Sequence, residues 1–220
     1  MPRIPLVRSP LAAVAALALA AAACSRPPPP LMADAAALTR AQRALEALPQ
    51  FAGRAPHVHA AALFHDDDIE IAIVDPDRAD TLHTYRYQDG RWQRGDAMGH
   101  TCALWTDALG KKTDDLALDR IDFATAARVR ANWYERARAV PGALADPDYN
   151  RLSGVWFYTR DYSSIAERGV ASSGDAPGPG QRDAGDRGEW STGPIAGENG
   201  IGYRIEFAID GSVRRFERLH

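Results

Sequence analysis

The stretch DIEIAIVDPDRADTLHTYRYQDGRWQR, residues 68–94, decides the fold of this chain. In residues 68–74 isoleucine alternates with polar or small residues, and this period of two predicts a half-buried strand. Asp75-Pro76-Asp77 predicts a turn, and Asp89-Gly90 is the dipeptide favoured where both central residues of a hairpin turn need a positive φ. We therefore predict an antiparallel meander of roughly three or four strands over residues 55–96.

Two helices are predicted on either side of this meander. Leu38, Ala41 and Leu45 recur at helical spacing, and Pro49 closes the run. Residues 122–140 carry a second apolar stripe, which ends at Pro141-Gly142 and consists of Ala126, Val129, Trp133, Ala137 and Val140. The arginines of the second helix are predicted to form a solvated flank, and they are Arg128, Arg130, Arg136 and Arg138.

More strands are predicted towards the end of the chain. Residues 154–162 are rich in aromatic and β-branched side chains, which favours a strand. Residues 203–209 alternate, and Asp210-Gly211 turns the chain into residues 212–219. Between these strands, residues 172–200 are dominated by Gly, Ser, Asp and Pro, a composition that predicts a disordered loop around the isolated Trp190.

The predicted fold class is α+β, with two helix-plus-antiparallel-meander units packed as one or two small sheets. The units are predicted at residues 38–120 and 121–220. This layout resembles the tandem helix-plus-sheet units of PepSY-like and β-lactamase-inhibitor-like periplasmic proteins, and the resemblance implies a curved sheet packed on a helix. It rests on the order of elements alone and assigns no role to any residue.

The N-terminus carries the pattern of an export signal. Arg3 and Arg8 precede residues 11–23, an apolar stretch of 13 residues that is shorter than the roughly 20 needed to span a bilayer. We therefore predict a signal peptide over residues 1–23. Ala21-Ala22-Ala23-Cys24 is also compatible with an ordinary Ala-x-Ala cleavage site, in which case Cys24 is incidental.

The cleavage region resembles that of bacterial lipoproteins. Cys24 follows three alanines and precedes Ser25, although Ala21 stands where that family usually has Leu. The resemblance implies that Cys24 receives several acyl chains, such as palmitate, which together anchor the protein firmly to a membrane. Ser25 also lacks the Asp that retains lipoproteins at the inner membrane, so the resemblance implies an outer-membrane protein facing the periplasm.

The residues after the cysteine predict a spacer. Residues 24–37 contain Pro27–Pro30 followed by small side chains, a pattern typical of a stiff polyproline II tether. Removal of residues 1–23 leaves 24 Lys and Arg against 29 Asp and Glu, a net charge of −5. Nucleic-acid binding needs a clustered basic surface, and this balance argues against it.

Histidines are the strongest lead to a site. His57 and His59 share one face of a predicted strand, and His65 precedes Asp66–Asp68, so imidazole and carboxylate groups could hold a metal ion. The alternative is a solvated strand edge. Cys102, beside His100, is either a reactive thiol or a small buried apolar side chain, and it has no disulfide partner if Cys24 carries lipid.

The remaining features leave the function open. Four tryptophans suggest either a groove for sugar or peptide or a core, and they are Trp92, Trp105, Trp133 and Trp156. Asp114-Asp115 and Asp146-Pro147-Asp148 occur in contexts typical of turns. No catalytic or nucleotide-binding motif is present, and no cofactor is predicted. The leading hypothesis is a non-enzymatic lipoprotein whose sheet or sheet edge binds an envelope protein or polymer; the alternative is a metal-binding or catalytic domain using His57, His59 and His65.

Overall fold

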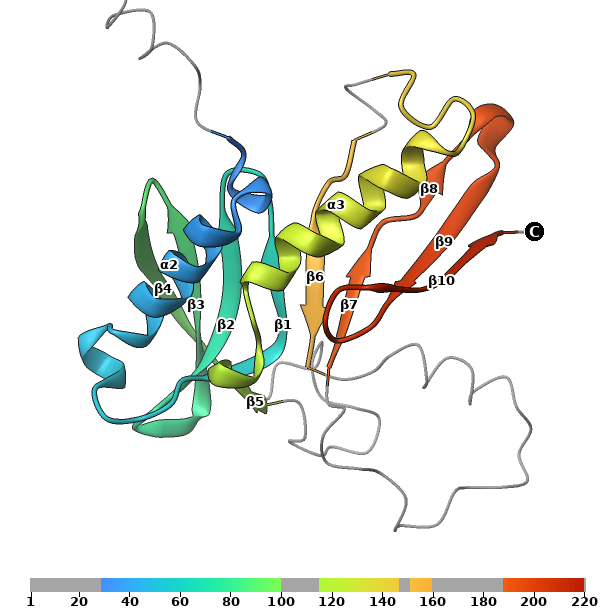
Figure 1. Ribbon diagram of the computed structural model, residues 1–220. Coiled ribbons are helices and arrows are strands. Elements are labelled where there is room, and N and C mark those ends of the chain that lie inside the picture. The colour runs from blue at the N-terminus through green and yellow to red at the C-terminus, as the bar shows by residue number, and fades with distance from the viewer. Residues whose placement is uncertain (1–28, 100–114, 147–150, 160–187, 220) are drawn as a thin grey trace, which may run out of the picture.

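Among the residues that it describes, the computed structural model has two α-helices and two antiparallel sheets, which confirms the predicted α+β class (Figure 1). It describes residues 29–99, 115–146, 151–159 and 188–219. The α-helices are α2 (Ala35–Glu46) and α3 (Ala124–Arg138). Short 3-10 helices are η1 (Leu31–Ala33), η2 (Pro49–Phe51), η3 (Leu118–Arg120) and η4 (Glu198–Gly200).

The larger sheet has the strand order β4-β3-β2-β1-β6-β7, and β5 pairs with β1 beside β6. Its first four strands are the predicted meander: β1 (His57–Phe64), β2 (Ile69–Asp75), β3 (Arg78–Gln88) and β4 (Arg91–Gly99). The others are β5 (Asp115–Ala117), β6 (Val155–Tyr158) and β7 (Glu189–Thr192). The smaller sheet has the order β10-β9-β8 and consists of β8 (Ile195–Ala196), β9 (Gly202–Phe207) and β10 (Val213–Arg218).

The meander forms for the reasons that its sequence predicts. Ile69, Ile71 and Ile73 are all buried on the face of β2 that the helices cover. At the β3–β4 turn, Asp89 has a φ of 53° and Gly90 a φ of 78°, so both residues take the left-handed conformation that this hairpin requires. The turn therefore fixes the register in which Gln88 pairs with Arg91.

The two sheets do not follow the predicted division into two units. β6 comes from the second predicted unit, but it pairs with β1 of the first, with Phe64 opposite Val155. β7 then extends the same sheet from β6. The predicted boundary near residue 120 therefore runs through the larger sheet, because local periodicity identifies a strand without identifying its partner.

The two α-helices lie on one face of the larger sheet (Figure 1). Most of the apolar side chains predicted to form their stripes are buried in the core. The predicted stripe of α3 is buried, from Ala126 to Val140. Trp92 of β4 donates a hydrogen bond from Nε1 to the carbonyl oxygen of Ala41, 2.8 Å away, and so ties α2 to the sheet. No helix within the described ranges has the length and apolar character needed to cross a bilayer.

Residues 188–200, predicted to be part of a disordered loop, are ordered in the structure. They contain β7, β8 and η4, and Trp190 is only 3% exposed. Its ring centre lies 4.9 Å from that of Phe157, and its Nε1 donates a 2.9 Å hydrogen bond to the Ile209 carbonyl. Burial of one large aromatic offsets a local composition that disfavours order. The rest of the predicted loop, residues 172–187, lies outside the described part of the chain.

The tether predicted for residues 24–37 ends earlier than expected. Met32 is fully buried, and the Leu31 amide donates a 2.7 Å hydrogen bond to the Asp66 carbonyl. Asp34 caps α2, because its Oδ1 accepts hydrogen bonds from the amides of Ala36 and Ala37. The small residues that suggested a spacer are therefore the first turn of a helix.

The arginines of α3 form the predicted exposed flank at Arg128, Arg136 and Arg138, whereas Arg130 is half-buried. Arg130 forms an ion pair with Asp66, with 3.1 Å between Nε and Oδ1. Arg128 donates a hydrogen bond to the Asp210 carbonyl, and Arg136 lies over the ring of Phe216. These contacts join α3 to the β1–β2 turn, to the β9–β10 turn and to β10, which spacing along the helix could not reveal.

Candidate functional site

The three histidines of the predicted metal site are not gathered in one place. His57 and His59 lie at the start of β1, whereas His65 follows its end, where its Nδ1 lies 2.8 Å from the Ser153 carbonyl oxygen. His59 is 4% exposed, and His57 is exposed. Within the part of the chain that the structure describes, no three His, Cys, Asp or Glu side chains group as metal ligands.

His59 instead pairs with a carboxylate that the sequence analysis assigned to a turn. β5 pairs with β1 so that Val58 lies opposite Leu116, and both of these side chains belong to the core. Because side chains alternate along a strand, His59 and Asp115 lie opposite each other on the other face. His59 Nδ1 is 2.6 Å from Asp115 Oδ1. A carboxylate at Nδ1 fixes the orientation of the imidazole ring.

The residue after His59 has an unusual backbone. Ala60 has a φ of 61°, a left-handed conformation that L-residues other than Gly, Asn and Asp rarely adopt. The register of β1 against β2 shifts between Val58 and Ala62, which marks a bulge. Thr159 holds the bulge, because its amide and its hydroxyl both donate to the Ala60 carbonyl, at 2.9 and 3.2 Å. Strained residues and bulges are frequent beside functional side chains.

A phenol lies on β6, the strand that pairs with β1 next to this bulge. Tyr158 pairs with Ala61 on one side and with Glu189 on the other. Burial raises the pKa of Tyr158, and the nearby Glu189 carboxylate raises it further. The phenol therefore stays protonated at neutral pH. β5 and the ends of β6 and β7 that carry these groups lie at the same end of the sheet (Figure 1).

This end of the sheet combines an oriented imidazole with a protonated phenol, groups that can accept and donate protons. The sequence predicts His59 as a site residue and places Asp115 in a turn, whereas nothing in it indicates Tyr158. No local signal could have found Asp115 and Tyr158, because the pairing of β1 with β5 and β6 joins segments far apart in the sequence.

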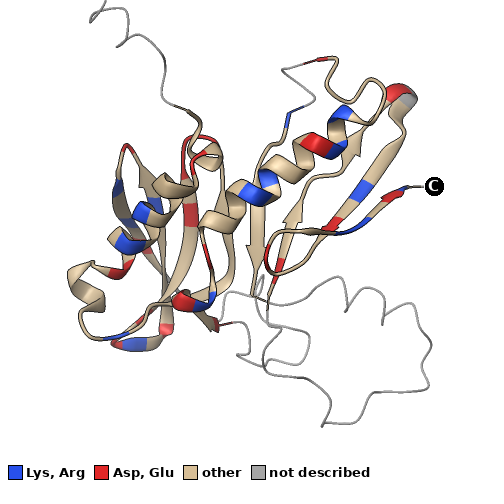
Figure 2. Cartoon of the chain, viewed as in Figure 1, with Lys and Arg blue, Asp and Glu red and all other residues tan. Residues whose placement is uncertain are grey.

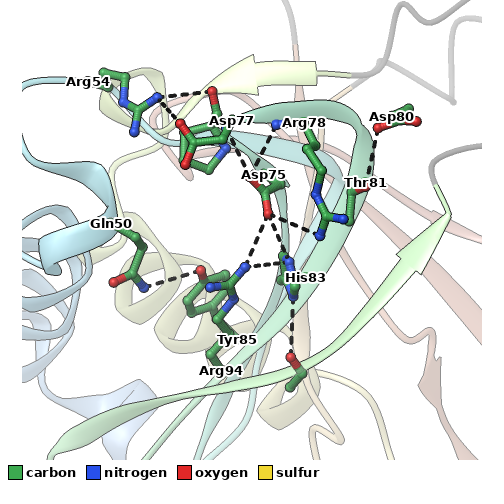
Figure 3. A network of polar contacts seen from close by, with 12 residues as sticks. Gln50, Arg54, Asp75, Asp77, Arg78, Asp80, Thr81, His83, Tyr85 and Arg94 are labelled. Carbon is green, nitrogen blue, oxygen red and sulfur yellow. Dashed lines mark hydrogen bonds and ion pairs between the residues drawn. The ribbon is translucent and has the colours of Figure 1, made fainter.

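A second polar network surrounds Asp75 at the β2–β3 turn (Figure 3). Its Oδ1 accepts hydrogen bonds from the amides of Asp77 and Arg78, at 2.9 and 3.2 Å. Its Oδ2 is 3.1 Å from His83 Nε2 and 3.2 Å from Arg94 Nη2. The network therefore joins the predicted Asp-Pro-Asp turn to β3 and β4.

The contacts of Asp75 keep it ionised. The Asp77 amide contributes most to lowering the pKa of the carboxyl group, burial opposes it, and His83 and Arg78 lower the pKa further. Arg94 Nη2 also approaches His83 Nε2. That nitrogen either donates to Asp75 or accepts from Arg94, since one ring nitrogen cannot do both. Asp75 Oδ1 holds the turn and Oδ2 ties it to β3 and β4, which gives this network a structural role.

The other candidates divide between the core and the segments not described. Trp133 is buried and donates from Nε1 to the Gly193 carbonyl at 3.1 Å, so it serves the core, and Trp92 of β4 is half-buried and bonded to α2. Trp156 is half-buried, opposite Leu63. Cys24, His100, Cys102, Trp105 and Asp114 lie outside the described residues.

Comparison of the chain with protein-family models, with curated proteins and with solved structures finds no match in any of the three.

Proposed function

We propose that the chain is a lipid-anchored protein of the bacterial cell envelope. Its folded body binds an envelope partner and does not catalyse a reaction. Residues 1–23 direct export, and the thiol of Cys24 receives the acyl chains. The body faces the periplasm, attached to the outer membrane. The support for the anchor is the leader pattern followed by a cysteine and a run of prolines.

The observation that carries this proposal is the small number of residues between Cys24 and the first residue bonded to the folded body. Leu31 is already hydrogen-bonded to Asp66, and Met32 is buried. Cys24 is separated from Leu31 by few residues, and the seven residues from Cys24 to Pro30 can reach at most about 25 Å. A lipid on Cys24 would hold the body close to the membrane surface, where a binding surface meets envelope partners.

The two cysteines offer a matched test of the anchor. Cells producing the full chain are labelled with a palmitate analogue, and the purified protein is assayed for the label. Cys24→Ala should abolish labelling and leave uncleaved precursor or misplaced protein, whereas Cys102→Ala should be labelled like the wild type. Normal processing and membrane retention of the Cys24→Ala protein would contradict the anchor.

A second candidate function is proton transfer or metal binding at His59. The observation that favours it is the 2.6 Å contact between His59 Nδ1 and Asp115 Oδ1 beside the left-handed Ala60. In metal sites, a carboxylate on one imidazole nitrogen commonly orients the other towards the ion. The purified full chain is analysed for bound metal, and its melting temperature is compared with and without a chelator. Absence of both metal and a chelator-induced shift would remove the metal form of this candidate.

A further inference from the structure

We propose that the outer edge of β10 binds an extended acidic peptide segment of an envelope partner, which adds a strand to the smaller sheet. This inference rests on the proposed binding function and names the surface and the chemistry of its partner. β10 lies at the edge of its sheet and pairs with β9 alone among the described strands. Edge strands expose main-chain groups that an extended peptide can bind.

The hydrogen bonds of the sheet identify which main-chain groups face outward. The Leu219 amide donates to the Gly202 carbonyl at 2.8 Å, so Leu219 and Gly202 form a hydrogen-bonded pair. Such pairs alternate along an antiparallel ladder, and Phe216 and Arg218 therefore occupy the positions whose amide and carbonyl groups point away from β9. Within the described part of the chain, no main-chain hydrogen bond joins either residue to a further strand.

The side chains along this edge are mainly basic (Figure 2). Arg214, Arg215 and Arg218 are exposed, and β10 contains one acid, Glu217. Arg215 is paired with Glu217, with 2.7 Å between Nη2 and Oε2. The strand thus has an excess of positive charge although the chain as a whole is acidic. A carboxylate-rich segment complements this charge, and like charges exclude a basic one.

An apolar surface lies on the same strand. Phe216 stacks on Tyr203 of β9 with ring centres 5.5 Å apart and an angle of 18° between the planes. The guanidinium of Arg136 lies 5.9 Å from the centre of the Phe216 ring. Alternate side chains of an added strand fall on this face, so the best partner alternates apolar residues with acids.

The edge at β4 differs in a way that makes it a useful control. β4 also carries exposed arginines, but Arg94 is held by Asp75, and the Trp92 side chain is committed to α2. Arg91 is exposed and basic, like Arg218, but it lies on an edge strand of the other sheet. Arg91→Glu therefore makes the same change of charge without touching β10.

The test uses the full-length protein in detergent micelles and a fluorescein-labelled peptide of alternating Glu and Val. Fluorescence anisotropy should show saturable binding, and a Lys-Val peptide of equal length should not bind. Arg218→Glu and Arg214→Glu should each weaken binding by about tenfold or more, because both introduce like charges at the edge. Arg91→Glu should bind as the wild type does, and melting temperatures would verify that all three variants fold.

Hydrogen exchange supplies the readout specific to strand addition. The amides of Phe216 and Arg218 should exchange more slowly with the peptide bound, whereas the outward-facing amides of Trp92 and Arg94 on the β4 edge should be unchanged. The inference is overturned by an absence of saturable binding, by equal binding of the Lys-Val peptide, by an equal loss with Arg91→Glu, or by unchanged exchange at Phe216 and Arg218. A dimer that Arg218→Glu dissociates, seen by sedimentation, would also overturn it and assign the edge to a second copy. None of these outcomes affects acyl labelling at Cys24, so failure of this inference is distinct from failure of the anchor.

Discussion

At the scale of single residues, Asp75 and His59 are buried polar side chains that contacts with neighbouring groups hold in place. Asp75 is buried, yet main-chain amides engage its Oδ1, and His83 and Arg94 engage its Oδ2. His59 is buried against Asp115 in the same way. Buried polar groups without partners are costly, so each such residue depends on a contact that its own segment does not provide.

The Asp75 network should make stability depend on pH. Its pKa is lower in the folded protein than in the unfolded chain, so its contribution is present above the unfolded pKa and is lost as the pH falls through the folded value. Asp75→Asn should lower the unfolding free energy at pH 7 by about 1–3 kcal/mol. The difference from the wild type should shrink below about pH 4.

Urea denaturation followed by circular dichroism at several pH values measures this effect. Asp80→Asn is the control, since Asp80 is exposed and its hydrogen bond joins it only to the neighbouring Thr81. A difference between Asp75→Asn and the wild type that stays constant down to pH 3 would contradict the assigned role of the charge.

The left-handed Ala60 gives a prediction about strain in β1. Ala60→Gly relieves a conformation that disfavours alanine by roughly 1 kcal/mol, which offsets the loss of a buried methyl group. Ala62→Gly, two residues along the same strand, loses a methyl group without this relief. Thermal unfolding should therefore show Ala60→Gly to be the more stable variant. Equal destabilisation of the two variants would argue against strain at the bulge.

At the scale of elements, the β9–β10 turn is held against α3. The Asn132 side chain donates to the Gly211 carbonyl at 2.8 Å, and Arg128 donates to the Asp210 carbonyl at 2.7 Å. Gly211 has a φ of 81° and lies so close to Thr125 that a Cβ would be 2.8 Å from its Cγ2. Glycine is thus required both by the backbone conformation and by the space beside the helix.

The two requirements at this turn can be separated by comparing two glycines. Gly200 has a φ of 74°, and a Cβ there meets nothing within 4 Å among the described residues. Gly200→Ala should therefore cost about 1 kcal/mol from the backbone alone, and Gly211→Ala about 2–3 kcal/mol because the clash with α3 is added. Chemical denaturation measures both. Equal losses would mean that the turn does not pack on α3 as the structure has it.

At the scale of the whole molecule, the larger sheet requires both halves of the chain. Val155 and Phe157 of β6 are fully buried against β1, and Trp190 of β7 contacts both Phe157 and Phe64. The first four strands therefore have an incomplete core until the last third of the chain has been added. We expect one cooperative unfolding transition for the body.

This dependence predicts how the chain responds to truncation. The chain that ends at residue 120 retains β1–β4 but lacks β6, β7 and α3. It should fail to fold, because β1 loses its pairing with β6 and α2 loses its apolar contacts with α3. Dispersion of amide signals in an NMR spectrum is the measurement. A well-dispersed spectrum from residues 24–120 would show that the first predicted unit is independent.

Much of the local structure can be read from the sequence. The meander, its Asp89-Gly90 turn and the apolar stripe of α3 depend on periodicity and on glycine, which act over a few residues. The predicted export signal and the lipid on Cys24 depend on the sequence alone and remain predictions. The order around Trp190 could not be read locally, since it comes from contacts with Phe157 and Ile209.

The candidate site belongs to the part that only the tertiary structure decided. The sequence singled out His59, but its partner Asp115 lies 56 residues away and reaches it through the pairing of β1 with β5. The outward-facing groups of β10 likewise depend on its register with β9. Local sequence determines whether a segment is a strand or a helix, because propensity acts over a few residues. Which strands become neighbours, and so which side chains meet, depends on burial shared by the whole chain.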